Sequence, residues 1–355
     1  MDYSKFYTPP EVAELLINQL RIPAPSKTVD ICCGSCNLLN AVKKRWKKAE
    51  LYGADIESCA VDDIHFLRID GRKYATKHKG EFPLVVANPP FDALKKKREY
   101  PGIFKGPFKE FETSRLEVEM LLANLLMLKE NGYLVIILPS SFVEATSYRQ
   151  ARSLLAKNYF INSIIKLSDD TFGASHISSY ALIIQRCIKE NSRSKLYMVR
   201  KSEQGFETVF ANYVAVKKML NGDWVSNSSK VNRNGISIKR GNISSSMFAE
   251  KGVPVLHTAK PSADWQPSVR CLSQNIEANV FAEPGDIVVS RIGKSAGSWC
   301  VYTGERAPIS DCLYCIKDPD GRFLERINGR VYDLPPKGVA TRYITMDDFV
   351  RWAMN

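Results

Sequence analysis

The sequence predicts an α/β protein with a mostly parallel, doubly wound sheet, followed by a smaller β-rich domain. Apolar strand-like runs alternate with helical stretches from about residue 1 to 195, which is typical of a parallel sheet covered by helices. Beyond about residue 230 the runs become short and are separated by Gly, Pro and Asp. We therefore expect a first domain at 1–195, a connector at 196–229 and a second domain at 230–355.

The first domain is expected to begin with a helix. Pro9-Pro10-Glu11 suits a helix start, and Thr8 is a candidate N-cap. A second helix is expected over 116–130, where apolar residues mark one broad face and Asn131-Gly132 follows. The strands of the predicted sheet are expected at 27–32, 50–55, 83–88, 132–138, 161–167 and 178–187.

The remaining chain is expected to be less regular. In the connector we expect a short strand at 195–199 and a helix around 213–220. In the second domain a short helix is expected near 346–354. The short strands of this domain are expected at 253–256, 286–290, 298–302 and 313–316.

The composition indicates a basic protein. The 355 residues carry 50 Lys and Arg against 38 Asp and Glu, a net charge of +12, which suits a nucleic-acid partner; a merely soluble basic protein is the alternative. The N-terminus lacks the apolar core of a signal peptide, and no run has the length of a membrane span. The nine cysteines lie mostly in apolar runs, so we expect reduced thiols in a cytoplasm.

The most informative motif is Asn88-Pro89-Pro90-Phe91, directly after the apolar run 82–87. Two consecutive prolines end a strand, so the motif is expected at the carboxyl end of a buried strand, where ligands bind in open α/β sheets. The Asn88 side-chain oxygen and the Pro89 carbonyl form a double acceptor for an NH2 group. Phe91 can stack on the planar group that carries this NH2. The motif therefore predicts a site that activates a planar amino group.

Three further segments predict a ligand cradle. The first strand runs into Asp30, a turn of small residues at 32–36 and a helix start, so a ligand can approach the backbone closely. Asp55, with Glu57 as the alternative, ends the second strand, where Rossmann-like folds hold a ribose. Asp70 is a candidate acceptor for an adenine amino group. The alternatives are an ordinary strand-to-helix turn at 32–36 and a surface turn residue at Asp70.

In this order, the motifs resemble those of S-adenosylmethionine-dependent DNA adenine-N6 methyltransferases from type I and related restriction–modification systems. Tyr7-Thr8-Pro9-Pro10 resembles the N-terminal cofactor motif of the class whose target-recognition domain follows the catalytic domain. Residues 30–39 resemble the signature D-x-A-C-G-S-G-x-L, except that Cys36 replaces the usual glycine. The resemblance implies a Rossmann-like methyltransferase fold with a seven-stranded, mostly parallel sheet, and S-adenosylmethionine as cofactor.

The resemblance also implies roles for individual residues. The implied catalytic residues are Asn88, Pro89, Phe91 and Phe172, the last as a second aromatic ring over the target base. The implied cofactor-binding residues are Tyr7, Thr8, Pro9, Asp30, Cys33, Gly34, Asp55, Asp70 and Asn88. The two oxygens of the tetrapeptide would hold the N6 amino group of a flipped-out adenine for direct in-line attack on the methyl group.

Two alternative functions stay open. The tetrapeptide identifies a planar NH2 group and not adenine itself, so an RNA base amino group or a protein glutamine amide is an alternative substrate. A DNA-specificity protein whose catalytic domain is silenced by Cys36 is the second alternative. A zinc site at Cys312 and Cys315 would need two more ligands, so buried strand thiols are the preferred interpretation and no metal is expected.

The second domain resembles the target-recognition domains of type I specificity subunits at 238–242 and 281–293. We therefore expect double-stranded DNA as a partner, with a separate specificity or nuclease subunit as a further candidate. The candidate nucleic-acid contacts lie in the basic run after Phe91 and in the second domain. They are Lys95, Lys96, Lys97, Arg98, Lys239, Arg240, Arg291 and Lys294.

Overall fold

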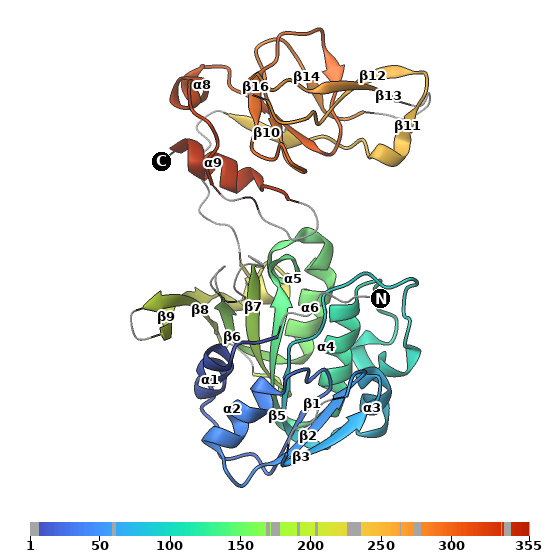
Figure 1. Cartoon of the computed structure of the whole chain (residues 1–355), viewed down its shortest axis with the longest axis vertical. Helices are drawn as coiled ribbons and strands as arrows, with labels where there is room; N and C mark the ends of the chain where they lie inside the picture. The colour runs from blue at the N-terminus through green and yellow to red at the C-terminus, as the bar shows by residue number, and fades with distance from the viewer. Residues whose placement is uncertain are drawn as a thin grey trace. The chain divides into compact units, whose positions relative to one another are not determined.

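The chain forms two compact units in a computed structural model, Met1–Ser226 and Asn227–Asn355, each with its own core (Figure 1). The structure describes residues 7–58, 62–167, 171, 178–189, 192–202, 205–225, 236–262, 264–272, 278–334, 336 and 342–354.

The first unit alternates helices and strands, as its sequence pattern predicts. Its helices are α1 (Pro10–Asn18), α2 (Asn37–Arg45), α3 (Gly71–Lys77), α4 (Leu116–Met127), α5 (Ser140–Glu144), α6 (Arg149–Asn158) and α7 (Val216–Leu220). Its strands are β1 (Lys27–Asp30), β2 (Glu50–Asp55), β3 (Ile64–Arg68), β4 (Phe82–Ala87), β5 (Leu128–Pro139), β6 (Phe160–Lys166), β7 (Ser179–Gln185), β8 (Ser194–Ser202) and β9 (Gly205–Val214).

These strands form one mixed sheet in the order β3-β2-β1-β4-β5-β7-β6-β8-β9. The first five are parallel, and β7 runs antiparallel between β5 and β6. The chain moves outward from β1 through β2 and β3 and returns to place β4 on the other side of β1. The strand order therefore reverses between β1 and β4, the position at which open α/β sheets bind ligands.

The expected count of seven strands is wrong, because the described sheet holds nine. The two additional strands, β8 and β9, form a hairpin that extends the sheet beyond β6. Both lie within the stretch 194–214, most of which was expected to be a connector. The alternating apolar residues of β8, such as Leu196 and Val199, pack on the two faces of the sheet and make it part of the first unit.

Helices cover both faces of the sheet. On β4 the side chains of Leu84 and Val86 pack with α1 and α2, whereas those of Val85 and Ala87 pack with α3 and α4. This explains why β4 reads as a continuous apolar run instead of an alternating one, since both of its faces are buried. The fold class expected from the sequence is confirmed by this layered arrangement (Figure 1).

Three local expectations differ from the structure. Strand β3 was not expected, because its exposed side chains give it little apolar signal. Helix α4 ends at Met127 instead of 130, since Leu128 already pairs with Phe82 of β4 and begins β5. Thr8 does not cap α1: Pro9 occupies the N-cap position, and no side chain caps this helix.

The second unit is rich in short strands and contains two helices in its described part. The strands are β10 (Ser237–Arg240), β11 (Phe248–Ala249), β12 (Val253–His257), β13 (Ser268–Leu272), β14 (Phe281–Ala282), β15 (Ile287–Ser290), β16 (Trp299–Val301), β17 (Ala307–Pro308) and β18 (Leu313–Lys317). The helices are α8 (Arg322–Ile327) and α9 (Met346–Met354). The four strands and the terminal helix expected here from the sequence are therefore present.

A four-stranded sheet, β10-β18-β15-β16, carries the main core of the second unit. Helices α8 and α9 pack on it through Phe323, Phe349 and Trp352. Within the described ranges of both units, no helix has the length and apolar character that crossing a bilayer requires. The cysteines in these ranges are all free thiols.

Candidate active site

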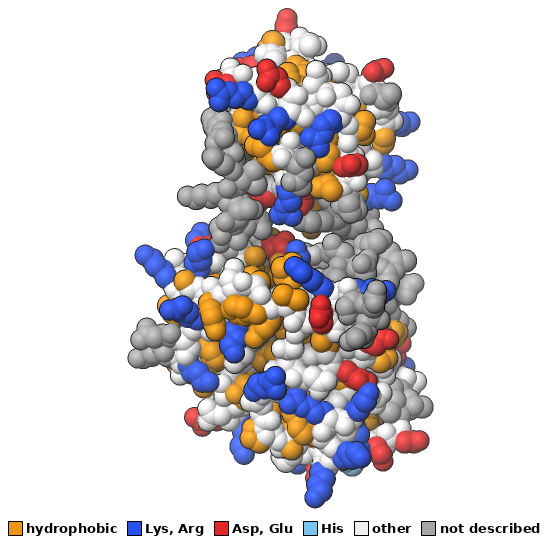
Figure 2. Space-filling view, turned by 90° about the vertical axis from the view of Figure 1, so that its left-hand side faces the viewer, with side chains coloured by type: hydrophobic (Ala, Val, Ile, Leu, Met, Phe, Trp, Pro, Cys, Tyr) orange, Lys and Arg blue, Asp and Glu red, His pale blue; other side chains and the backbone are white. Residues whose placement is uncertain are grey.

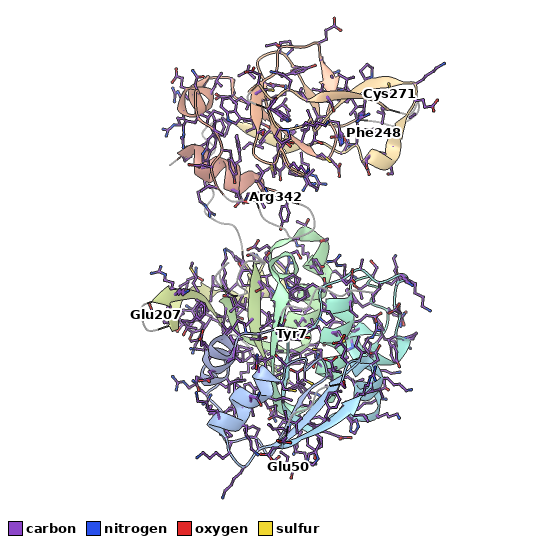
Figure 3. The ribbon with its side chains drawn as sticks, in the orientation of Figure 1. Tyr7, Glu50, Glu207, Phe248, Cys271 and Arg342 are labelled. Atoms are coloured by element: carbon purple, nitrogen blue, oxygen red, sulfur yellow. The ribbon has the colours of Figure 1, made fainter. Side chains whose placement is uncertain are left out.

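The reversal of strand order brings two chemically important strand ends together. Asp30 is the last residue of β1, and Asn88 directly follows β4; the two strands are paired through Thr28–Leu84 and Val29–Val85. A cavity of about 340 Å³ lies at these ends. Figure 3 shows Tyr7, one of its lining residues, far from Glu50 at the opposite, starting end of β2. The described lining residues used below are Tyr7, Thr8, Asp30, Cys33, Gly34, Asn37, Asp55, Glu57, Asp70, Arg72, Asn88, Pro89 and Phe91.

The turn between β1 and α2 lets the backbone line the cavity. Cys36 N–H donates to the Cys33 carbonyl at 2.6 Å, and Gly34 has a φ of 48°. A Cβ on Gly34 would lie 2.5 Å from the ring of Tyr7, so only glycine fits beneath that ring. Tyr7 is itself half exposed and forms part of the cavity wall. The turn and the N-terminal segment therefore pack closely against each other at Gly34 and Tyr7.

Cys36 adopts the left-handed conformation with a φ of 60°, which costs a side-chain-bearing residue roughly 1–2 kcal/mol. Its side chain is completely buried in the core beneath α1 and α2 and is not among the described cavity-lining residues. The sulfur of Cys36, which stands in place of the usual glycine, therefore lies in the core. Cys33 does line the cavity, and its hydrogen bond with Cys36 together with burial raises the pKa of its thiol.

Asp30 is almost completely buried, and its Oδ1 accepts from the Cys32 N–H at 3.0 Å. Burial raises the pKa of this carboxyl from 3.8 to about 8, although the hydrogen bond from Cys32 opposes the shift. Asp30 therefore holds a proton at neutral pH in the free chain. A cation placed beside it would favour the carboxylate, so this position is suited to a positively charged group.

Both carboxylate oxygens of Asp55 accept hydrogen bonds from backbone N–H groups. Oδ2 accepts from Gly34 N–H at 2.9 Å, and Oδ1 accepts from Glu57 N–H at 3.0 Å. These bonds fix the β1–α2 turn against the end of β2. Glu57, the alternative ribose acid, is exposed and also lines the cavity. Asp55 thus shapes the cradle, and each of its oxygens keeps a second lone pair for a ligand hydroxyl.

Asp70 caps α3 and is held by Arg72. Its Oδ1 accepts from the Arg72 backbone N–H at 2.8 Å, and both of its oxygens accept from the Arg72 guanidinium. The same guanidinium donates to Glu119 at 2.8 Å and to Glu99 at 3.0 Å. Burial alone would lower the pKa of Arg72, but the three carboxylates raise it, so Arg72 stays charged. Asp70 is therefore a structural member of an ion-pair network as well as a cavity wall.

Asn88 is positioned by a residue from the N-terminal segment. Its Nδ2 donates to Thr8 Oγ1 at 3.0 Å, and the Thr8 carbonyl in turn accepts from Asn37 Nδ2 at 2.8 Å. Pro89 and Phe91 follow and line the cavity. The structure thus brings together the segments around Thr8, Asn37 and Asn88, which are far apart in the sequence, and the tetrapeptide faces the same space as Asp30.

The segment after Phe91 forms a loop that pairs with the residues leading into α4. Leu94 N–H donates to the Ser114 carbonyl at 2.7 Å, and Arg98 N–H donates to the Thr113 carbonyl at 3.0 Å. Lys95 and Lys96 are exposed on this loop. Lys97 pairs with Glu112, and the Arg98 guanidinium lies 4.8 Å above the ring of Phe104. Of the four predicted contacts in this run, Lys95 and Lys96 are therefore exposed, whereas Lys97 and Arg98 interact with side chains of the segment that follows.

In the second unit, two of the predicted basic contacts converge. Arg240 Nη2 lies 2.9 Å from the Asp311 carboxylate, and Arg291 Nε donates to the Asp311 carbonyl at 2.9 Å. Lys239 leaves β10 from the face opposite to Arg240, since successive side chains alternate along a strand. Lys294 is exposed in the turn after β15. Phe172, the remaining predicted site residue, lies outside the described residues.

Sequence reasoning missed Arg72, Asn37 and Glu119. Nothing in their local sequence distinguishes them from surface or core residues of a helix. Glu119 is completely buried on the largely apolar helix α4, and this burial of a charged residue is a signal that only the structure reveals.

The two cysteines of the zinc alternative differ in their position. Cys315 is buried in β18, and Cys312 directly precedes that strand.

Comparison with known proteins supports one family. The family model described as N-6 DNA Methylase matches residues 2–212. A curated relative, the type II methyltransferase M.VspI of Vibrio sp. (strain 343), is 26% identical over 181 residues, which are 46% of this chain and 43% of that protein. The chain thus matches less than half the length of this relative.

Two solved structures have a similar fold. A type I restriction-modification system methyltransferase subunit from Streptococcus thermophilus aligns with a TM-score of 0.51 at 18% identity, over 62% of this chain and 57% of that one. The type IIG restriction endonuclease BpuSI aligns with a TM-score of 0.50 at 11% identity, over 88% of this chain and 52% of that one. At these identities the likeness concerns the fold alone.

Replacing Arg72 with methionine should destabilise the first unit by about 3–5 kcal/mol, because Glu119 would be left buried without its cation. Urea unfolding of the full chain measures this loss. Lys97→Met is the matched control: it breaks the exposed Lys97–Glu112 pair and should cost less than about 1 kcal/mol. Equal effects of the two substitutions would contradict a buried ion-pair network.

Asp30→Asn should change the pH dependence of stability. The folded pKa of about 8 exceeds the unfolded value of 3.8, so neutral Asp30 contributes stability that is complete below about pH 4 and lost as the pH rises to about 8. The free energy of unfolding of the variant, minus that of the parent, should therefore rise by about 1.4 kcal/mol per pH unit over this range and then level off. Chemical denaturation at pH 5, 6, 7, 8 and 9 measures it; a constant difference would show that Asp30 is not shifted.

Proposed function

This chain belongs to the N-6 DNA Methylase family, and we propose that it transfers a methyl group from S-adenosylmethionine to the N6 amino group of adenine in DNA. The membership agrees with the resemblance identified from the motifs, and S-adenosylmethionine is the cofactor that it implies. The observation that carries the proposal is the shared cavity at the ends of β1 and β4, which is lined by both the buried acid Asp30 and the amide of Asn88.

The residues of the cavity fit this cofactor. The described lining residues include four acids, Asp30, Asp55, Glu57 and Asp70, and one guanidinium, that of Arg72. Asp30 holds a proton in the free chain, and a cation beside it would favour its charged form, so the lining suits a ligand with positive charge. We assign Asp30 to the amino group of the methionine part, the acids after β2 to the ribose, and Asp70 to the adenine end. When bound, S-adenosylmethionine supplies a methyl group activated by its sulfonium.

The tetrapeptide supplies the second half of the chemistry. An aromatic amine is a poor nucleophile because its lone pair is delocalised into the ring. Asn88 Oδ1 and the Pro89 carbonyl would accept its two hydrogens and favour a tetrahedral nitrogen with a localised lone pair. Phe91, which lines the same cavity, would stack on the base. Catalysis would then depend on positioning and oriented dipoles, without a covalent intermediate.

An adenine in a duplex cannot reach a cavity at the end of a sheet, so we infer base flipping, which costs a few kcal/mol of unstacking. The basic side chains on the visible face are spread over both units and outnumber the acidic ones there (Figure 2). The exposed Lys95 and Lys96 lie on the loop after the tetrapeptide, separated from Phe91 by three residues, and are our candidates for phosphate contacts beside the cavity. Arg240, Arg291, Lys239 and Lys294 are candidates for contacts from the second unit, which we propose to be the target-recognition domain.

We further propose a role in a restriction–modification system, with a separate nuclease or specificity subunit as a candidate partner. The match to a type II methyltransferase supports this. A chain with catalytic and recognition domains in one polypeptide would read a short, asymmetric DNA site.

The deciding experiment incubates the full chain with methyl-labelled S-adenosylmethionine and unmethylated bacterial genomic DNA, total RNA or total protein. We expect N6-methyladenine in the DNA nucleosides, measured by mass spectrometry. Asn88→Ala should lower turnover at least about 100-fold while DNA binding is retained. Label only in RNA or protein would overturn the DNA substrate. No transfer with retained DNA binding would favour a specificity protein with a silent catalytic domain.

Replacing Lys95 and Lys96 with alanine should weaken DNA binding and reduce its salt dependence. Each lost phosphate contact lowers the slope of log K against log salt by about 0.9, so the double variant should lose about two units of slope. Fluorescence anisotropy at several salt concentrations measures this. Lys47 and Lys48, an exposed pair that precedes β2 at the opposite end of the sheet, provide the control double variant. An unchanged slope for the Lys95/Lys96 variant would exclude this loop from the phosphate contacts.

A further inference from the structure

We propose that Arg115 binds a phosphate group of duplex DNA beside the catalytic cavity. This inference rests on the proposed function, because it adds a DNA contact to the same reaction. Arg115 lies outside the basic run 95–98, and nothing in the neighbouring sequence marks it as a contact. It is the residue directly before α4, and the structure gives it an unusual combination of fixed and free donors.

Arg115 lies next to residues that line the cavity. The N–H of the following residue, Leu116, donates to the Asp92 carbonyl at 2.9 Å, so the start of α4 is bound to the segment that leaves the tetrapeptide. Leu116 lines the cavity, as does Phe91, which directly precedes Asp92. Arg115 is therefore one residue from the cavity wall, where a DNA strand has to pass if its adenine is to enter.

Two arginines of the first unit bind completely buried glutamates of α4, but they use their donors differently. Arg72 binds three carboxylates through Nε, Nη1 and Nη2, and its side chain is only 11% exposed. Arg115 binds through Nε alone, to Glu117 Oε1 and to the Tyr148 hydroxyl, each at 3.0 Å. Its side chain is 42% exposed, and within the described ranges neither Nη1 nor Nη2 has a protein partner. Arg115 thus keeps its two terminal NH2 groups for a ligand.

The charge of Arg115 is maintained by a buried acid. Glu117 is completely buried, and its Oε1 also accepts from the Tyr148 hydroxyl at 2.7 Å. A buried carboxylate is costly without a cation beside it, and Arg115 is the cation that pairs with Glu117. Burial alone would lower the pKa of Arg115, but the Glu117 carboxylate raises it, so the guanidinium stays charged.

The backbone of Arg115 is fixed as well. Its N–H donates to Thr113 Oγ1 at 3.1 Å, and its carbonyl accepts from the N–H groups of Val118 and Glu119, each at 3.2 Å. With the backbone and Nε both held before DNA arrives, little conformational freedom remains to be lost on binding.

The free end of this side chain is suited to phosphate. A planar guanidinium with two free NH2 groups matches two oxygens of one phosphate in a bidentate contact. Phosphates are the acceptors that every duplex presents along a strand, whatever its sequence. A guanine edge accepts the same fork but carries no charge, so the salt dependence and a neutral phosphate analogue separate the two.

Arg115→Met should weaken binding of the full chain to duplex fragments of unmethylated bacterial genomic DNA about 10-fold and lower the salt slope by about 0.9. Fluorescence anisotropy at several salt concentrations, with S-adenosylhomocysteine present, measures both. Arg186→Met is the matched control: Arg186 is exposed and follows β7 at the sheet edge opposite the cavity, so its loss should change neither quantity. An unchanged slope for Arg115→Met, or an equal fall for both variants, would overturn the inference.

A second variant guards against a folding defect, because Arg115→Met leaves Glu117 buried without its cation. Arg115→Met combined with Glu117→Gln removes both charges, leaves the net charge of the chain unchanged and keeps an acceptor for the Tyr148 hydroxyl. Urea unfolding first confirms that this double variant is folded. It should show the same loss of slope as Arg115→Met. A parental slope in the double variant would assign the effect of the single substitution to misfolding and overturn the inference.

Neutral methylphosphonates locate the contact in the DNA site that the chain methylates. They replace, one at a time, the phosphates that flank the target adenine. At one position the kcat/KM of the parent should fall about 10-fold and that of Arg115→Met less than about twofold. Equal responses of parent and variant at every position would exclude a phosphate contact in favour of a base edge.

The failure of this inference and that of the proposed function give different results. DNA methylation with an unchanged salt slope for Arg115→Met would preserve the proposed function and overturn the phosphate contact. A lowered slope in a chain that methylates none of the offered substrates would preserve the contact and overturn the proposed function.

Discussion

The parallel pairing of β1 with β4 is the constraint on which the rest of the site depends. It joins two chain segments that are more than fifty residues apart, and it places the end of one beside the end of the other. Asp30 at the end of β1 and Asn88 directly after β4 carry different chemistry, a buried acid and an amide. The strand pairing places both in the wall of one cavity, at the position where open α/β sheets bind ligands.

The site is held in place by polar contacts that lie beneath and beside the residues assigned to the ligand. The Thr8 hydroxyl accepts from the Asn88 amide, the N–H groups of Gly34 and Glu57 donate to the Asp55 carboxylate, and the Arg72 guanidinium donates to Asp70. A catalytic group that is already bound by the protein needs little reorganisation when substrate arrives. The buried Asp30 shows the associated cost: its desolvated carboxyl disfavours the charged form until a cation is placed beside it.

The motifs were predictable because each depends on local chemistry. The Pro89-Pro90 pair has to end a strand, small residues after β1 allow a close turn, and the apolar run of β4 is typical of a buried strand. By contrast, β3 has few apolar side chains and was not expected. The short strand expected at 195–199 is part of β8, but its pairing with β9, which extends the sheet, was not expected. The cap predicted at Thr8 was wrong, because Pro9 occupies the N-cap position; the Thr8 hydroxyl accepts from the distant Asn88 amide.

The sequence by itself determined the fold class, the cradle after the first strand and the tetrapeptide that ends the fourth strand of the structure, since strand endings and close turns follow from the backbone preferences of proline and glycine. Only the tertiary structure decided which hydrogen-bond and ion-pair partners the polar side chains have. Arg72 binds three carboxylates from three separate segments, and Thr8 connects α2 with the end of β4. Such contacts join residues far apart in the chain, so no local pattern records them; they exist only once the sheet has been assembled.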